Sequence, residues 1–291
     1  MTDPTQVFAE HRGLLFTVAY EMLGSTADAE DVVQESWLRW AAADHTDVRD
    51  PRAYLVRVVT RQSLNRLRSL HRQRESYVGT WLPEPLVTGP DVLEDVELAD
   101  SVSFAMLVVL ETLTPLERAV FVLREVFAFG YDDIAAATGR TPEAVRQLAS
   151  RARNHVQARR PRVAPPARTT ELMTRFFEAA AGGDLQALMD LLAPDVVLLS
   201  DGGGVKKANL RPIHGPDKVA RFLWSVTPHE ARIEAGWTVA NGAPAMLLSL
   251  DGELDAVVTV VVDGDRIRQI YLVRNPEKLR SVGELREVRR R

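Results

Sequence analysis

LTPLERAVFVLREVFAFGYDDIAAATGRTPEAVRQLASRARNHVQARR, residues 113–160, decides the fold because it predicts three consecutive helices. Thr114, Pro115 and Glu117 form a capping box with proline at the first helical position, which predicts a helix start. The third helix follows Thr141, which repeats the combination of a capping side chain and a proline. The stretch is therefore predicted to be all-helical.

The short middle helix covers residues 131–138, and Gly139 suits the left-handed conformation that ends helices. A short helix, a glycine turn and a basic helix are typical of a helix-turn-helix that binds DNA. Residues 140–160 hold six Arg and one Glu, which favours phosphate, although a solvated basic face is the alternative. The predicted base contacts are Arg146, Gln147, Ser150 and Arg151, and Arg153 is predicted to contact phosphate.

The composition restricts what a chain of 291 residues can do. The absence of cysteine excludes disulfides and thiolate metal sites, and the six His lack zinc-site spacing, so we expect no metal and no cofactor. No apolar run approaches the roughly 20 residues that span a bilayer, and the N-terminus lacks a signal-peptide pattern. We therefore expect a cytoplasmic protein without membrane contact. A net charge of −4 limits DNA binding to local basic surfaces.

Two amphipathic helices are predicted before residue 50, the first over residues 1–24 and the second after Ser25. On the second helix, one side is apolar and carries Ala29, Val32, Val33, Trp37 and Trp40. The opposite side is polar and carries Asp31, Gln34, Glu35 and Leu38. An apolar residue among acids is either a stray residue on a solvated face or part of a docking surface for a basic partner helix.

A third helix is predicted from Asp50 to about Glu75, and it has a basic stripe opposite its apolar side. The stripe consists of Arg57, Arg61, Asn65, Arg68 and Arg72, and Tyr54 near the helix start could stack on a base. Residues 76–100 contain six acidic side chains and no Lys or Arg. Two basic helical regions are thus joined by an acidic connector.

Three motifs in this order resemble bacterial sigma factors of the extracytoplasmic-function type. They are DAEDVVQESWLRW (28–40), DPRAYLVRVVTRQSLNRLRS (50–69) and the helix-turn-helix at 113–160. The resemblance implies two partners, core RNA polymerase and promoter DNA. It implies that Asp31, Gln34, Glu35 and Leu38 dock on the polymerase clamp helices. It further implies that the Arg-striped helix recognises the minus-ten element and the last helix the minus-thirty-five element.

The connector contains WLPEP (81–85), whose prolines oppose a helix. WLPEP is either a spacer with one exposed aromatic residue or a specific motif, and an anionic connector could follow the basic nucleic-acid channel of the polymerase. It is similar to a motif of the sigma-factor subgroup that carries a C-terminal SnoaL-like domain. That resemblance predicts the nature of the remaining chain.

Residues 169–291 predict an α+β cone like the SnoaL fold, after an extended proline-rich linker at 161–168. Helices are expected over 170–181, after Asp184 and near 217–226. Strands separated by turn signals such as Asn241-Gly242 are expected at 196–200, 232–240, 244–250, 254–262 and 266–274. The fold class is therefore multidomain, with two all-α domains followed by an α+β domain. The predicted limits are 1–75, 76–100, 101–160, 161–168 and 169–291.

Two further motifs of the subgroup are present in the cone, DGGG (201–204) and NPEKL (275–279). Val205 stands where a lysine is common, and Glu277 replaces a usual Asp. Asp201 with His214 is the best candidate for an acid/base pair, and a bare structural turn and an interaction surface are the alternatives. The predicted interdomain regulatory residues are Trp81, Pro83, Glu84, Asp201, Gly202, Gly203, Asn275, Pro276 and Lys278.

The sequence thus favours an alternative sigma factor regulated in cis by its C-terminal domain, and not an enzyme. An unidentified small-molecule ligand of the cone stays open. The alternatives are a transcription regulator that binds DNA without polymerase and a SnoaL-like enzyme fused to a DNA-binding module.

Overall fold

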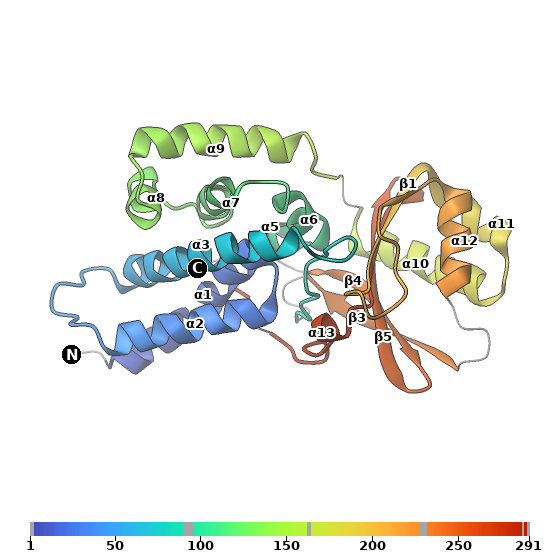
Figure 1. The fold of residues 1–291 in the computed structure, drawn as a ribbon, viewed down its shortest axis with the longest axis horizontal. Coiled ribbons are helices and arrows are strands. Elements are labelled where there is room, and N and C mark those ends of the chain that lie inside the picture. The colour runs from blue at the N-terminus through green and yellow to red at the C-terminus, as the bar shows by residue number, and fades with distance from the viewer. Residues whose placement is uncertain (1–2, 90–95, 162–163, 227–231, 287, 290–291) are drawn as a thin grey trace.

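A computed structural model describes residues 3–89, 96–161, 164–226, 232–286 and 288–289. Residues 90–95 of the predicted acidic connector lie outside the described part. The N-terminal part is helical (Figure 1). Its elements are α1 (Pro4–Leu23), α2 (Thr26–Ala41), α3 (Pro51–Arg74), α5 (Val96–Val102), α6 (Phe104–Leu110), α7 (Pro115–Phe121), a π-helical turn (Val122–Val126), α8 (Tyr131–Thr138) and α9 (Pro142–Gln157).

The capping signals act as predicted. Thr114 and Glu117 form the capping box at the start of α7, and Thr141 accepts a hydrogen bond from the Ala144 backbone at the start of α9. Gly139 ends α8 with φ at 67°, a left-handed conformation that glycine adopts without steric cost. The helix-turn-helix of α8 and α9 is therefore present.

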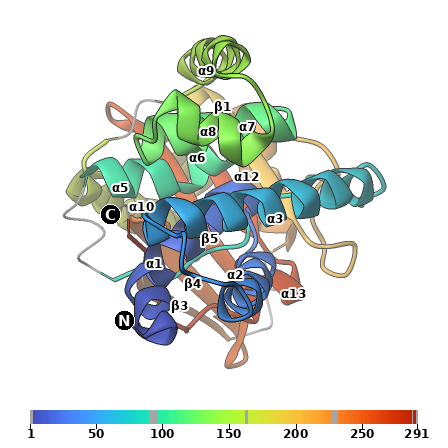
Figure 2. The ribbon, with the colours of Figure 1, turned by 90° about the vertical axis from the view of Figure 1, so that its left-hand side faces the viewer.

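The helices of both predicted N-terminal domains share one hydrophobic core. The predicted apolar side of α2 is buried through Ala29, Val32, Val33 and Trp40, and α1 and α3 pack against it. The same cluster continues into α7, α8 and α9, and Figure 2 shows α8 lying over α3. Burial of a continuous apolar surface holds the two helical parts together.

The C-terminal part is a six-stranded sheet with helices, so the predicted α+β class is confirmed. The helices are α10 (Pro166–Ala181), α11 (Leu185–Asp190), α12 (Pro216–Val226) and α13 (Pro276–Leu279). The strands are β1 (Leu192–Asp201), β2 (Ile213–His214), β3 (Ile233–Ala240), β4 (Ala243–Leu250), β5 (Glu253–Asp263) and β6 (Arg266–Val273). Their order is β2-β1-β6-β5-β4-β3, in which β1 and β6 are parallel and β3 to β6 form the predicted antiparallel meander.

Three local differences from the sequence-based expectation have physical causes. The linker at 161–168 was predicted to be extended throughout, but α10 begins at Pro166, because proline fixes φ near the helical value and suits a first turn. The predicted limit at residue 100 falls inside α5. The two-residue strand β2 and the four-residue helix α13 are too short to give a periodic pattern.

The two faces of the sheet have different partners. One face packs on α10, α11 and α12 through a core that includes Leu172, Val219 and Ile270. The other face buries Leu82 of the connector and Phe104 of α6, whose ring lies 5.2 Å from the ring of Tyr271. The sheet is therefore covered on one side by the helical part of the chain (Figure 1).

Candidate functional site

The connector is a buried structural segment in this arrangement. Residues 81–85 are extended, as their prolines predict, but Leu82 and Glu84 are buried and Trp81 is partly covered. The alternative of a spacer with an exposed aromatic residue is therefore wrong. Pro83 is buried as well. The connector lies between the α-helical part and the sheet, where it contacts both.

Asp201, at the end of β1, accepts hydrogen bonds from four groups. The Tyr77 hydroxyl donates to Oδ1 at 2.6 Å, and the Gly203 backbone N–H donates to the same oxygen at 3.0 Å. The Leu82 backbone N–H and the Lys278 ammonium donate to Oδ2 at 2.9 and 2.7 Å. These five residues are called the Asp201 cluster below. Because Asp201 is 1% exposed, its buried carboxylate is stabilised by these hydrogen-bond partners and not by water.

Lys278 contacts the connector as well as Asp201. Its ammonium donates to the Leu82 carbonyl as well as to Asp201, and it lies 4.1 Å from the centroid of the Trp81 ring. The Arg74 guanidinium lies 3.5 Å from the centroid of the same ring. Burial lowers the pKa of Lys278 to about 8, while Asp201 opposes that shift.

The glycines of the DGGG loop allow the close approach of Asn275. Gly203 has φ at 62°, and a Cβ atom there would lie 2.5 Å from Asn275 Cγ. The Asn275 amide donates to the Tyr77 oxygen at 2.9 Å. The Asn275 side-chain carbonyl oxygen accepts from the Glu277 N–H, so Asn275 caps α13, which begins at Pro276. A Cβ on Gly202 would lie 2.1 Å from the Lys206 carbonyl oxygen. Burial raises the pKa of Tyr77, so its hydroxyl remains a donor.

Glu84 ties the connector to α2 and to the C-terminal tail. Its carboxylate accepts hydrogen bonds from the Thr26 backbone N–H at 2.9 Å, from the Thr26 hydroxyl and from the Ser281 hydroxyl at 2.7 Å. Its own N–H donates to the Gly24 carbonyl at 2.8 Å. One buried acid therefore binds both Thr26 at the start of α2 and Ser281 of the tail.

Asn241 adds an interdomain contact that the sequence did not predict. It was expected only as a turn residue, and its amide donates to the Tyr20 hydroxyl at 2.6 Å and to the Val102 carbonyl at 3.0 Å. Its side-chain carbonyl accepts from the Leu86 N–H at 3.1 Å, and Tyr20 donates to the Glu84 carbonyl at 2.7 Å. The Asn241-Gly242 pair predicts a turn, but it does not indicate which residues the Asn241 side chain contacts.

The described part of the C-terminal tail returns to the N-terminal helices. Arg286 pairs with Glu30 at 3.0 Å, and the Arg289 N–H donates to the Thr17 hydroxyl at 2.9 Å. Val288 is buried in the helical core. One chain end therefore joins the sheet domain to α1 and α2.

The predicted docking side of α2 is exposed. Asp31, Gln34, Glu35 and Leu38 all lie at the surface, and Leu38 is 66% exposed. The Gln62 amide of α3 donates to Glu35 at 3.1 Å. The surface thus presents one large apolar side chain among acidic and amide groups.

The predicted basic stripe of α3 is only partly free. Asn65, Arg68 and Arg72 are exposed, whereas Tyr54 and Arg57 are half-buried. Arg61 donates to the carbonyls of Ala136 and Ala137 at 2.8 and 3.4 Å, which places α8 directly on the stripe.

The predicted base-contacting residues of α9 are accessible. Arg146, Gln147, Ser150 and Arg151 are exposed along one side of the helix. Arg153, predicted for phosphate, pairs with Glu125 at 2.6 Å in the chain without DNA.

The candidate acid/base pair is not brought together. His214 is exposed on β2 and pairs with Val197, which is four residues from Asp201 along β1 and so roughly 13 Å away. Among the described residues, no three His, Cys, Asp or Glu side chains gather where a metal could bind. Within the same part of the chain, no helix is both long and apolar enough to span a membrane.

Comparisons with known families and proteins agree with this arrangement. Family models described as Sigma-70 region 2, Sigma-70 region 4 and SnoaL-like domain match residues 7–73, 103–156 and 173–274. The chain is 42% identical over 266 residues to the ECF RNA polymerase sigma factor SigJ of Mycobacterium tuberculosis, covering 89% of this chain and 83% of the relative. It is 32% identical to the probable sigma factor SigI of the same organism, with 95% of each chain covered. The crystal structure of M. tuberculosis SigJ superposes with a TM-score of 0.74 at 34% identity, over 94% of this chain and 97% of that one.

The two helical regions and the cone define a sigma factor with an appended SnoaL-like domain. The chain belongs to the extracytoplasmic-function RNA polymerase sigma factors, and it acts in transcription initiation. Its sigma regions imply RNA polymerase and promoter DNA as partners.

Proposed function

We propose that this sigma factor docks on the clamp helices of core RNA polymerase through Asp31, Gln34, Glu35 and Leu38. The observation that supports this surface is Leu38, which is 66% exposed between acidic residues on a helix whose other side is buried. An apolar anchor inside a charged rim is the usual composition of a specific docking surface.

For promoter recognition, we assign the minus-thirty-five element to α9 and the minus-ten element to the α3 stripe. The exposed side chains of α9 suit base edges in a major groove. Within the α3 stripe, exposed Arg61 donates hydrogen bonds to the carbonyls of α8. We therefore infer that α8 leaves α3 when the sigma factor engages a promoter, because Arg61 cannot contact DNA while it donates to the carbonyls of α8.

We assign regulation in cis to the contact through which the SnoaL-like domain fixes the connector. The single supporting observation is the Asp201 cluster, in which one carboxylate and one ammonium grip both backbone groups of Leu82. A connector that is fixed in this way sets the spacing of the two sigma regions. Its release would allow them to separate.

We propose no catalytic role for the SnoaL-like domain. Asp201 already accepts four hydrogen bonds and lies far from His214, so the predicted acid/base pair is not formed.

The test is binding and transcription with purified core polymerase. Leu38→Glu is expected to weaken core binding about tenfold or more, because it replaces the apolar anchor by a charge. Leu185→Glu is the matched control, since Leu185 is an exposed leucine on α11. If the wild-type chain does not bind core polymerase, or if both variants lose binding equally, the assignment of this docking surface is wrong.

A further inference from the structure

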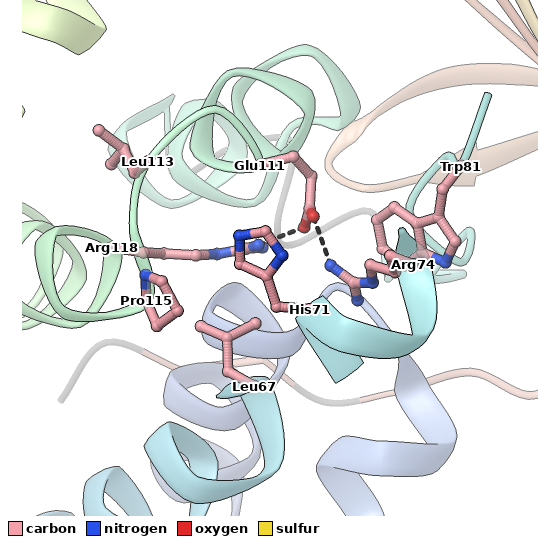
Figure 3. A pocket seen from close by; sticks show the side chains of 8 residues that line it. All are labelled: Leu67, His71, Arg74, Trp81, Glu111, Leu113, Pro115 and Arg118. Atoms are coloured by element: carbon pink, nitrogen blue, oxygen red, sulfur yellow. Dashed lines mark hydrogen bonds and ion pairs between the residues drawn. The ribbon is translucent and has the colours of Figure 1, made fainter. Parts of the chain in front are cut away.

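Arg74, the last residue of α3, links the first sigma region to the second. Its guanidinium pairs with Glu111, which follows α6, and its Nη2 donates to the Leu23 carbonyl of α1 at 2.7 Å. Glu111 pairs in turn with Arg118 of α7, whose Nε donates to the Glu21 carbonyl of α1 at 2.9 Å. Figure 3 shows Glu111 between the two guanidinium groups. One carboxylate of the second region is therefore tied to the end of α3.

The two regions are not closely packed beside this ion pair. A cavity of about 190 Å³ lies between the end of α3, the connector and the start of α7 (Figure 3). It is lined by Leu67, His71, Arg74, Trp81, Glu111, Leu113, Pro115 and Arg118. Ion pairs that water surrounds contribute little to stability. The strength of the contact between the regions at this place thus depends on what shields Arg74 from water.

The ring of Trp81 shields Arg74 on the side of the connector. The guanidinium carbon lies 3.5 Å from the ring centroid, and the Arg74 side chain is only 15% exposed. A Cβ on Gly24 would lie 2.9 Å from Cη2 of Trp81, so the ring also fills the space at the end of α1. Burial lowers the pKa of Arg74, and Glu111 opposes that shift. An ion pair beside an aromatic ring is stronger than one in water because the local dielectric constant is lower.

The SnoaL-like domain holds this ring in place. The Lys278 ammonium lies 4.1 Å from the centroid of Trp81 and pairs with Asp201 at 2.7 Å. Burial lowers the pKa of Lys278, and Asp201 opposes that shift. The charge of Arg74 lowers the same pKa further, whereas the charge of Glu111 raises it. The domain and the ion pair therefore meet at opposite ends of one short chain of contacts, with Trp81 between them.

We propose that Trp81 couples the SnoaL-like domain to the ion pair of Arg74 and Glu111, so that the domain strengthens the contact between the two sigma regions. This inference rests on the proposed regulation in cis and names the contact through which it acts. While the domain fixes the connector, Trp81 shields Arg74 and the ion pair stabilises the closed arrangement. When the connector is released, water reaches the ion pair and most of its contribution is lost. Because coupling is reciprocal, loss of the ion pair also weakens the contact of the domain with the connector.

The test measures the ratio of open to closed chains in the absence of polymerase and DNA. Because the chain has no native cysteine, spin labels at Glu10→Cys on α1 and Asp133→Cys on α8 can report the distance between the regions in the full-length protein. Arg74→Gln and Trp81→Leu are each expected to raise the ratio of open to closed chains about fivefold or more. The double variant is expected to exceed the larger single effect by less than about twofold, because both substitutions remove the same contribution.

Two further variants make this result specific. Glu111→Gln removes the ion pair from its other side, so it is expected to raise the ratio at least as much as Arg74→Gln, and it replaces that variant if Arg74→Gln does not fold. Glu125→Gln is the matched control, because Glu125 pairs with Arg153 at 2.6 Å inside the second region. This control is expected to leave the ratio unchanged.

The proposal is overturned if the single variants leave the ratio unchanged, or if their effects multiply in full in the double variant. Transcript yield with core polymerase separates this coupling from regulation in cis. If the ratio responds as expected and the yield does not change, the coupling stands and the proposed regulation is wrong.

Discussion

At the scale of single residues, the contact between the SnoaL-like domain and the sigma regions depends on a few buried polar groups. Asp201, Glu84 and Asn241 each hold backbone groups of the connector or of the helices beside it. Such groups contribute little net free energy when they are satisfied. Their removal is costly because it leaves their partners unpaired in a dry environment.

Asp201→Asn tests this asymmetry. The substitution removes the charge that pairs with Lys278 and replaces one acceptor by a donor that faces Tyr77 or Leu82. It is expected to lower the free energy of unfolding by about 3–5 kcal/mol, measured by urea denaturation. Asp217→Asn on the exposed side of α12 is the control, with an expected change within about 0.5 kcal/mol. A loss below about 1 kcal/mol for Asp201→Asn would contradict the importance of the buried pair.

Lys278 predicts a pH dependence with a defined sign. Its pKa is lowered to about 8 from an unfolded value near 10.5, so between these values the unfolded chain binds a proton that the folded chain does not. The cost of charging buried Lys278 is present in full below pH 8 and disappears as the pH rises. Relative to Lys278→Met, the wild type should therefore gain stability from pH 8 to 10, by at most about 1.4 kcal/mol per pH unit. Exposed Lys218→Met should show no such change relative to the wild type.

The residue types in these contacts were partly predictable. WLPEP, DGGG and NPEKL were identified by resemblance, and the structure places Trp81, Asp201 and Lys278 together. Tyr20, Thr26 and Arg118 gave no signal, because an isolated Tyr, Thr or Arg inside an amphipathic helix has no pattern that reveals a partner far away in the sequence. Such contacts depend on tertiary packing alone.

At the scale of elements, the helices with strong caps and the strands between turn signals were the predictable ones. Thr114, Thr141 and Gly139 determine α7, α9 and the end of α8 through local hydrogen bonds and backbone conformation. The packing of α8 on the α3 stripe was not predictable, because Arg61 gives the same pattern whether it faces DNA phosphates or carbonyl groups of another helix.

The position of α8 on α3 leads to a prediction about the complex. Because the chain has no native cysteine, spin labels can be attached at Gln73→Cys on α3 and Asp133→Cys on α8. The distance between them is expected to lengthen when core polymerase and promoter DNA are added. The pair Glu10→Cys and Gln73→Cys lies within the first sigma region and should keep its distance. An unchanged Gln73–Asp133 distance in an active complex would mean that α8 stays on α3.

Recognition by α9 is tested at Arg146. Its side chain is exposed and only loosely paired with Glu143 at 3.5 Å, so it is available to a base. Arg146→Ala is expected to cost about 1–3 kcal/mol of discrimination at one base pair of the minus-thirty-five element. The measurement is transcription from promoters with single substitutions. A uniform loss on all promoters would instead assign Arg146 to phosphate.

In the whole molecule, one face of the sheet packs on the helices of the cone and the other face packs on the sigma regions and the connector. Leu82 and Phe104 are buried against β4, β5 and β6, so removal of residues 169–291 would expose them to water. A change in transcription after such a deletion would therefore combine loss of regulation with loss of packing. A single substitution that separates the domains without emptying either core is the sharper experiment.

Gly242 and Gly252 provide that experiment as a matched pair. Both follow a residue with positive φ in a hairpin turn and have φ at 65° and 87°, so valine strains each turn to a similar degree. A Cβ on Gly242 would lie 2.7 Å from Ala99 Cα, whereas a Cβ on Gly252 has nothing within 4 Å. Gly242→Val is thus expected to push the hairpin off α5 and enlarge the molecule in small-angle scattering, and Gly252→Val is not.

If the SnoaL-like domain regulates in cis, only Gly242→Val changes transcript yield with core polymerase. Equal yields from both variants and the wild type, with separation of the domains seen for Gly242→Val, would show that the domain contact does not control initiation.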